Sequence, residues 1–234
     1  MNILVNGGSI SRGPTSWPYH VQSNIGGNLI NLAQAGSGNS YVHETTIAEL
    51  AQRPYDLVLI QWTPFVRVDY KVKDIHKFNT IYTSKYQSEH NDWPGKVIHP
   101  VNDQDYVEKD WVFGCGYLNN SKEDAELTRA FEDYYHYTGA AEHMYHALMK
   151  IISLQSYLKV NNIPYLFCFG RPLKLLKRYD FLNQQLDYSR MYTDHYILDI
   201  ASNNNWWVSG TQHPNDQAYK QFADLITPKI KSIL

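Results

Sequence analysis

Short apolar runs alternate along the chain with longer segments of helical spacing. The clearest run is Leu57-Val58-Leu59-Ile60, which is continuously apolar rather than alternating. Such a run is typical of a strand buried on both faces of a parallel sheet. Strands are therefore predicted at residues 2–6, 28–32, 56–61 and 165–169, with the last strands at 196–200 and 206–208.

Helices are predicted between these strands. Ser16-Trp17-Pro18 is typical of a helix start, because proline suits the first helical turn. The strongest helical spacing covers residues 140–160, and His213-Pro214-Asn215-Asp216 leads into a terminal helix that reaches about Ile233. Further helices are expected at residues 40–52 and 181–186.

Strands separated by helices indicate a parallel sheet that is covered on both sides. We expect residues 1–234 to form a single domain, with an aromatic-rich insertion at about 64–139 where the periodicity weakens. The tyrosines and tryptophans of this insertion suit either a sugar-stacking wall or packing within the insertion itself.

Ligands of parallel α/β sheets bind outside the carboxyl ends of the strands, where the strand order reverses. The loops expected at that edge carry Ser9, the stretch Gly36–Asn39, Thr63 and His213. These residues are therefore expected to meet on one rim.

Composition excludes several partner classes. The formal net charge is −2 with acids and bases interspersed, so neither a nucleic acid nor an anionic membrane surface is expected as a partner. Cys115 and Cys168 lie far apart and form no metal or disulfide motif. The sequence has no basic-then-apolar leader and no apolar run long enough to span a bilayer, so a cytoplasmic location is expected.

Three chemistries use a glycine-rich turn after a first strand. Gly8 and Gly13 have the spacing of a phosphate-binding loop, but Pro14 stands where that loop needs a lysine. A dinucleotide fingerprint is absent, and residues 31–34 carry no carboxylate. The remaining chemistry is a serine nucleophile, Ser9, exposed at a tight turn.

Four short blocks resemble those of the SGNH (GDSL-like) hydrolases. Gly7-Gly8-Ser9-Ile10-Ser11 resembles their Gly-Asp-Ser-x-Ser block, with Gly8 in place of the aspartate. Asn31-Leu32-Ala33-Gln34-Ala35-Gly36 resembles their second block, and His213-Pro214-Asn215 resembles their fifth. Asp56-Leu57-Val58-Leu59-Ile60 resembles the strand that leads to their third block. The resemblance covers both ends of the chain and leaves out the insertion.

The resemblance implies a flavodoxin-like three-layer α/β/α sandwich and a catalytic pair. Ser9 would be the nucleophile and His213 the general base, and the backbone N–H groups of Ser9 and Gly36 would hold the oxyanion. No metal and no organic cofactor are required.

The chain lacks two residues that this family has at the site. The third block normally ends in Gly-x-Asn-Asp, whereas Thr63-Pro64-Phe65-Val66 lacks the asparagine that completes the oxyanion hole. Asn39 or Thr63 could supply a donor from the same rim. The aspartate expected three residues before the histidine is replaced by Gly210, and the nearest carboxylates are Asp199 and Asp216.

Other charged residues have weaker assignments. Thr63, Arg67 and Arg171 are candidate substrate contacts at the rim. Asp69 could join Arg67 there, although an ordinary salt bridge is the favoured interpretation of this pair. His143 and His146 are three apart on a predicted helix, but no third ligand has a characteristic spacing. No metal site is expected.

The predicted function is hydrolysis of an ester, such as an O-acyl or O-acetyl group on a carbohydrate or small molecule. Two alternatives stay open. The missing asparagine and aspartate suggest a degenerate binding protein that keeps only the fold, and the same serine could instead serve an acyltransferase. The oligomeric state does not follow from the sequence.

Overall fold

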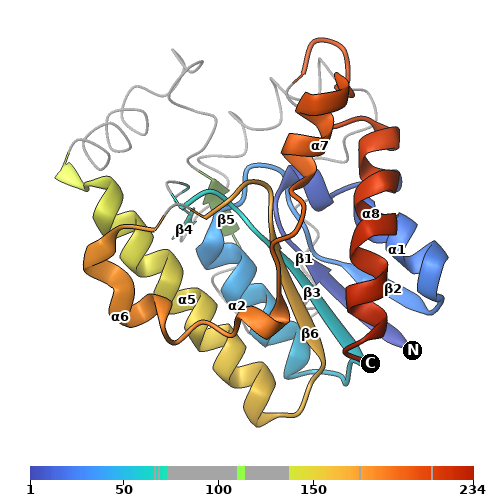
Figure 1. Cartoon of the computed structure of the whole chain (residues 1–234). Coiled ribbons are helices and arrows are strands. Elements are labelled where there is room, and N and C mark those ends of the chain that lie inside the picture. The colour runs from blue at the N-terminus through green and yellow to red at the C-terminus, as the bar shows by residue number, and fades with distance from the viewer. Residues whose placement is uncertain (66, 68, 73–109, 114–136, 174, 212) are drawn as a thin grey trace.

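The computed structural model describes all residues except 66, 68, 73–109, 114–136, 174 and 212. Its centre is a parallel sheet of five strands in the order β2-β1-β3-β6-β7 (Figure 1). The strands are β1 (Asn2–Asn6), β2 (Asn28–Asn31), β3 (Leu57–Trp62), β6 (Tyr165–Phe169) and β7 (Met191–Tyr192). This is the strand order of flavodoxin-like folds.

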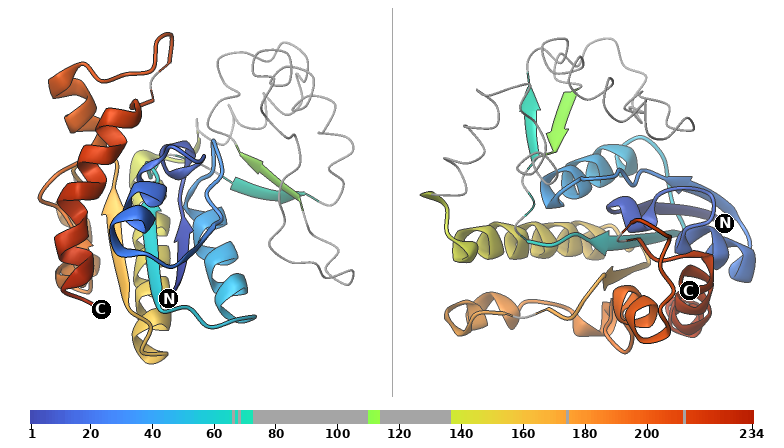
Figure 2. Two further views of the ribbon diagram at one scale, coloured as in Figure 1. Left: turned by 90° about the vertical axis from the view of Figure 1, so that its right-hand side faces the viewer. Right: turned by 90° about the horizontal axis from the view of Figure 1, so that it is seen from above.

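Helices cover both faces of the sheet, so the predicted three-layer α/β/α sandwich is confirmed. One face carries α1 (Trp17–Ile25), α7 (Ile197–Asn204) and α8 (Asp216–Lys231). The other face carries α2 (Asn39–Leu50), α5 (Ala140–Val160) and α6 (Asp180–Asn183). Figure 2 shows α8 and α2 on opposite sides of the strands.

The alternation of side chains along each strand explains the continuous apolar runs. Val58 and Ile60 of β3 pack in the cluster that includes α2 and α5, whereas Leu57 and Leu59 pack in the cluster that includes α1 and α8. Successive side chains point to opposite faces, and both faces are covered, so the central positions of these strands are apolar on both sides.

The end of the sheet differs from the prediction. Residues 196–200 belong to helix α7 rather than to a strand, and residues 206–208 contribute only an isolated bridge between Trp207 and Pro214. Ile197, Ile200 and Ala201 are the buried residues of α7. Their spacing of three and four residues is helical, which a window of five residues cannot distinguish from a short strand.

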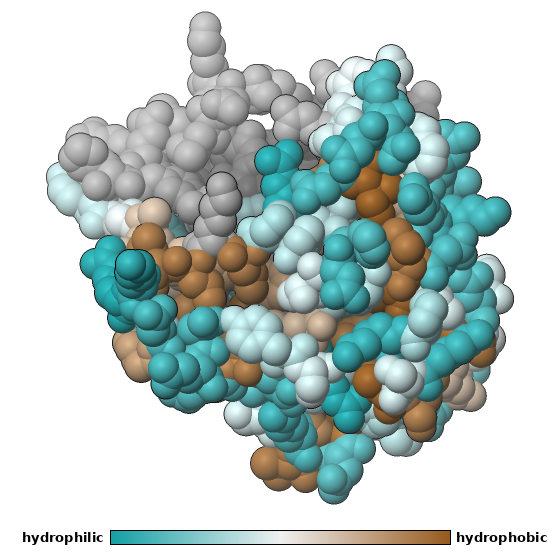
Figure 3. Space-filling view, viewed as in Figure 1, coloured by the Kyte–Doolittle hydropathy of each residue, from teal (hydrophilic) through white to brown (hydrophobic). Residues whose placement is uncertain are grey.

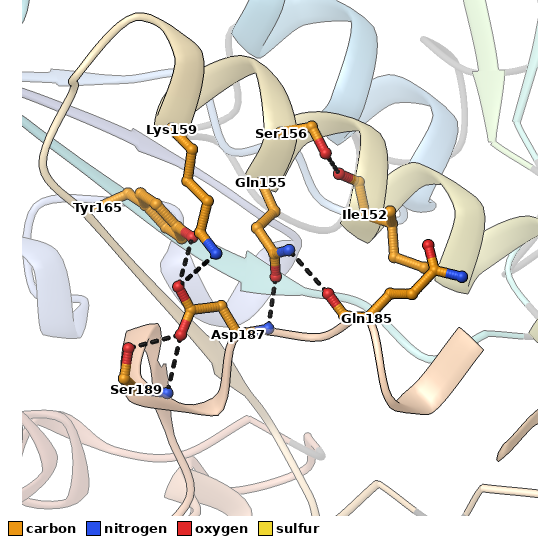
Figure 4. A network of polar contacts seen from close by, with 8 residues as sticks. All are labelled: Ile152, Gln155, Ser156, Lys159, Tyr165, Gln185, Asp187 and Ser189. Atoms are coloured by element: carbon orange, nitrogen blue, oxygen red, sulfur yellow. Dashed lines mark hydrogen bonds and ion pairs between the residues drawn. The ribbon is translucent and has the colours of Figure 1, made fainter. Parts of the chain in front are cut away.

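The last strand of the sheet is β7, which has two residues and is anchored by α5 (Figure 4). Gln155 donates from Nε2 to the Gln185 carbonyl (2.9 Å) and accepts from the Asp187 N–H (2.7 Å). Lys159 Nζ lies 2.8 Å from Asp187 Oδ2. These bonds fix the loop that leads into β7, where few ladder bonds are available to do so.

The remaining described elements are short. A hairpin pairs β4 (Asp69–Val72) with β5 (Asp110–Phe113), and single turns of 3₁₀ helix occur at η1 (Ser9–Ser11), η2 (Lys177–Tyr179) and η3 (Tyr188–Arg190). Most of the predicted insertion at 64–139 and Cys115 lie outside the described residues, so the single-domain assignment and the role of the aromatic side chains there stay predictions.

None of the helices in the described part of the chain combines the length and the apolarity needed to cross a membrane. The described residues on the face shown in Figure 3 are mostly hydrophilic, with hydrophobic residues in smaller groups among them.

The chain leaves β1 for β2 on one side and later returns to β3 on the other. The strand order therefore reverses between β1 and β3, and the crevice of the sheet lies outside their carboxyl ends. Both chain termini lie at the opposite edge (Figure 1).

Candidate active site

The turn that carries Ser9 begins where β1 ends against β3. A Cβ at Gly7 would lie 2.9 Å from the backbone oxygen of Gln61 and 2.9 Å from Ser11 Oγ. The neighbouring strand is therefore too close for any side chain, and only glycine fits at this position.

A buried asparagine fixes the start of this turn. Asn6 Oδ1 accepts the Gly7 N–H (2.8 Å), while Asn6 Nδ2 donates to the hydroxyls of Thr45 (2.8 Å) and Thr46 (3.0 Å) on α2. Asn6 is completely buried. These bonds satisfy a polar group in the core and join the turn to α2.

A second polar group fixes the far end of the turn. Ser11 Oγ donates to Gln61 Oε1 (2.6 Å) and accepts from Trp17 Nε1 (2.9 Å). Both ends of the turn are thus held by buried bonds, whereas the half-buried Ser9 hydroxyl makes no hydrogen bond among the described residues. The backbone of the turn is therefore held in place, while the nucleophilic role of Ser9 stays a prediction.

The turn after β2 lies directly beside the Ser9 turn. The Gly7 carbonyl accepts from the Gln34 N–H (3.1 Å) and from Ser37 Oγ (3.0 Å). Gly36, with φ of +81°, takes the left-handed position in the tight turn from Gln34 to Ser37. Within the described chain, neither the Gly36 N–H nor the Ser9 N–H donates a hydrogen bond. The predicted oxyanion donors are therefore on neighbouring turns and are not engaged.

Asn39 and Thr63 bind each other. Asn39 Oδ1 accepts from the Thr63 N–H (2.9 Å) and hydroxyl (3.0 Å), and Asn39 Nδ2 donates to the Thr63 carbonyl (3.2 Å). Both residues are buried. The observed role of this pair is to join the start of α2 to the loop after β3, while direct contacts of either residue with oxyanion or substrate stay predictions.

His213 lies in the loop between α7 and α8. Its carbonyl accepts from the Val208 N–H (2.9 Å), and Asn215 caps α8 by accepting the Ala218 N–H (3.1 Å). No hydrogen bond joins the His213 ring to Ser9 or to any other residue that the structure describes. Burial, together with the positive charge of Arg67, lowers the pKa of His213 below 6.5. The imidazole is therefore neutral at pH 7, as a general base must be.

No carboxylate orients this imidazole in the described residues. Gly210 is exposed at the family position of the acid, and Asp216 instead pairs with His20 at 3.0 Å. Asp199 lies in the first turn of α7. Among the described residues, neither Asp199 nor Asp216 forms a hydrogen bond with the His213 ring.

Arg67 lies between the turns that follow β1 and β2. Its Nη1 atom donates to the Ser37 carbonyl (3.2 Å) and is 2.9 Å from the point that a Cβ at Gly8 would occupy. Arg171, the other predicted cation, is exposed in the loop after β6. The structure thus places Arg67 beside the Ser9 turn. Arg171 forms no hydrogen bond with this turn among the described residues.

Asp69 caps α2 from the hairpin strand β4. Its buried carboxylate accepts the N–H groups of Gly38 and Tyr41, the latter at 2.9 Å. Burial raises the pKa of Asp69 to about 6, although these N–H groups oppose the increase. The favoured interpretation from the sequence, a salt bridge with Arg67, differs from this arrangement, because nothing in the sequence indicates that β4 crosses the start of α2.

The two histidines that are three residues apart lie on α5. His146 Nε2 pairs with Glu142 Oε1 at 2.8 Å on α5, and His143 is buried. Within the described chain, no three His, Cys, Asp or Glu side chains are grouped so that they could hold an ion.

No family model matches the chain, and no curated protein matches it significantly in sequence. Solved structures do match. Esterase EstA from Pseudoalteromonas sp. superposes with a TM-score of 0.51 at 14% identity, over 99% of this chain and 97% of that one.

Two further structures are similar over their whole length, at lower TM-scores. TesA gives 0.49 at 12% identity over 100% of both chains. A candidate SGNH hydrolase from Slackia heliotrinireducens gives 0.45 at 11% identity over 98% of both chains. The chain has the fold of the SGNH hydrolases.

Proposed function

We propose that the protein is a serine hydrolase of the SGNH type that cleaves an ester, with Ser9 as its nucleophile. The observation that carries this proposal is the Ser9 turn itself. Buried bonds of Asn6 and Ser11 hold it at the β1/β3 crevice, while no described residue forms a hydrogen bond with its hydroxyl or accepts one from the nearby N–H groups of Ser9 and Gly36.

The chemistry follows from these groups. His213 takes the proton of the Ser9 hydroxyl while Oγ attacks the acyl carbon, and the carbonyl oxygen becomes an oxyanion that the Ser9 and Gly36 N–H groups stabilise. The ester C–O bond then breaks, and the leaving alcohol takes the proton from His213. Water repeats the sequence on the acyl-enzyme, which releases the acid and restores Ser9.

The replacement of the orienting acid by Gly210 fits a slower enzyme rather than an inactive one. Such an acid chiefly fixes the tautomer and orientation of the imidazole, so its absence reduces the rate. We expect the substrate to be an O-acylated carbohydrate or small molecule, with no metal or organic cofactor.

The first experiment measures hydrolysis of p-nitrophenyl acetate by the purified full chain. Ser9→Ala and His213→Ala are each expected to lower kcat/KM by at least about 10³-fold. The exposed residues Ser202 and His195 provide matched controls, and their alanine variants should retain wild-type activity.

Full activity in either Ser9→Ala or His213→Ala would remove that residue from the mechanism. A wild type without activity would favour the binding-protein alternative. Ester exchange in the presence of an added alcohol, in preference to hydrolysis, would favour the acyltransferase.

A further inference from the structure

Arg67 is a cation without an acidic partner in the described part of the chain, and it lies beside the proposed nucleophile. We infer that its guanidinium stabilises the oxyanion that forms at Ser9 and supplies the donor that the asparagine provides in related sequences. This inference rests on the proposed function.

The position of the guanidinium is the first argument. Arg67 follows β3 in a turn closed by its N–H on the Pro64 carbonyl (3.1 Å), and its Nη1 reaches the Ser37 carbonyl (3.2 Å). Nη1 also lies 2.9 Å from the Cβ that any side chain at position 8 would have. The guanidinium is therefore packed over the backbone next to Ser9 and is held at the turn that contains Gly36.

The second argument concerns His213. The charge of Arg67 contributes to the lowered pKa of that imidazole, so the guanidinium that packs beside Gly8 also lies near His213. Negative charge develops on the substrate oxygen between these groups as the serine attacks. Arg67 is half-buried, so its interaction with that charge is weakened less by solvent than it would be at the surface.

The third argument is the free capacity of the side chain. A guanidinium has five N–H donors, and only the bond to Ser37 uses one among the described residues. The remaining donors can serve an incoming anion. In the proposed reaction, the anion that must form beside Ser9 is the oxyanion.

Two departures from the family pattern then have one explanation. A side chain at position 8 would displace Nη1 from its place, and an aspartate there would also neutralise it, so Gly8 leaves the space that Arg67 occupies. The loop after β3, which lacks the asparagine, is also the loop that carries Arg67.

The experiment compares Arg67→Gln and Arg67→Lys with wild type on two esters, neutral p-nitrophenyl acetate and the anionic mono-p-nitrophenyl succinate. Loss of one oxyanion donor typically lowers kcat by about 10²–10³-fold. We expect a loss of that size in Arg67→Gln on both esters with little change in KM, and partial recovery in Arg67→Lys. The exposed Arg178 provides the matched control, Arg178→Gln, which should behave as wild type.

A pH profile separates this role from a merely structural one. Without the charge of Arg67, the pKa of His213 rises, so the midpoint of the rising limb of kcat/KM should move to higher pH in Arg67→Gln and stay in place in Arg67→Lys. Circular dichroism spectra and melting temperatures of all variants test whether each one folds, and Arg67→Lys keeps the test available if Arg67→Gln does not.

Several results would overturn the inference. A decrease in kcat confined to the anionic ester, or an increase in KM with unchanged kcat, would assign Arg67 to recognition of a substrate anion. Wild-type kcat in a folded Arg67→Gln, while Ser9→Ala is inactive, would refute the oxyanion role and leave the proposed hydrolase standing. If wild type hydrolyses neither ester, the proposed function fails and this inference fails with it.

Discussion

The buried carboxylate of Asp69 gives the structure a pH-dependent stability that can be worked out in advance. It joins β4 to the first turn of α2, where it accepts the N–H groups of Gly38 and Tyr41. A Cβ at Gly38 would lie 2.8 Å from Asp69 Oδ2, so the contact is close. The informative perturbation is Asp69→Asn, which keeps an acceptor oxygen and removes the titration.

The magnitude follows from the pKa values. The pKa of Asp69 is about 6 in the folded chain against 3.8 for an unperturbed aspartate, and this difference corresponds to about 3 kcal/mol. Because the folded pKa is the higher one, the folded state holds the proton more tightly. The contribution to stability is present below pH 4 and is lost as the pH rises through 6.

The assay is urea unfolding of wild type and Asp69→Asn at intervals between pH 4 and 7.5. The free energy of unfolding of wild type, minus that of the variant, should fall with increasing pH, mostly between pH 4 and 6, and then level off. A difference that stays constant, or that rises with pH, would show that the carboxylate is not buried at the start of α2.

Two further predictions concern the core and the base. Leu148→Ala on α5 removes a completely buried side chain and should lower the free energy of unfolding by about 2–5 kcal/mol. Met149→Ala, at a position that is 41% exposed, should change it by less than about 1 kcal/mol. Equal effects of the two substitutions would contradict the placement of α5 against the sheet. The kcat/KM of ester hydrolysis should rise with pH about a midpoint below 6.5, because burial and the charge of Arg67 lower the pKa of His213. A midpoint at or above 6.5 would contradict the described environment of that ring.

Most of the fold could be predicted because burial on both faces leaves a strong signal. The strand at 165–169 and the helix at 140–160 were predicted with the observed bounds. The strand β7 could not be predicted, since two residues carry no periodicity and its position depends on side chains of α5 and the preceding loop. Helix α7 was mistaken for a strand for a related reason, because its apolar run is short.

The candidate site was predictable only as far as topology determines it. Parallel strands end at one edge, so the proximity of the Ser9, Gly36 and Thr63 loops followed from the predicted order of elements. The bond between Arg67 and Ser37 joins two of these loops, and its geometry depends on packing rather than on local sequence. Asn6 did leave a signal, namely a polar residue at the end of a buried strand, which indicates a specific buried partner.

The central claim is that Ser9 is a reactive nucleophile, and a fluorophosphonate probe tests it most directly. The probe transfers its phosphonyl group to an activated serine with loss of fluoride, and the intact mass of the protein reports the adduct. We predict a single adduct on wild type, located on the peptide that contains Ser9, and none on Ser9→Ala. An unlabelled wild type, or equal labelling of Ser9→Ala, would contradict the account.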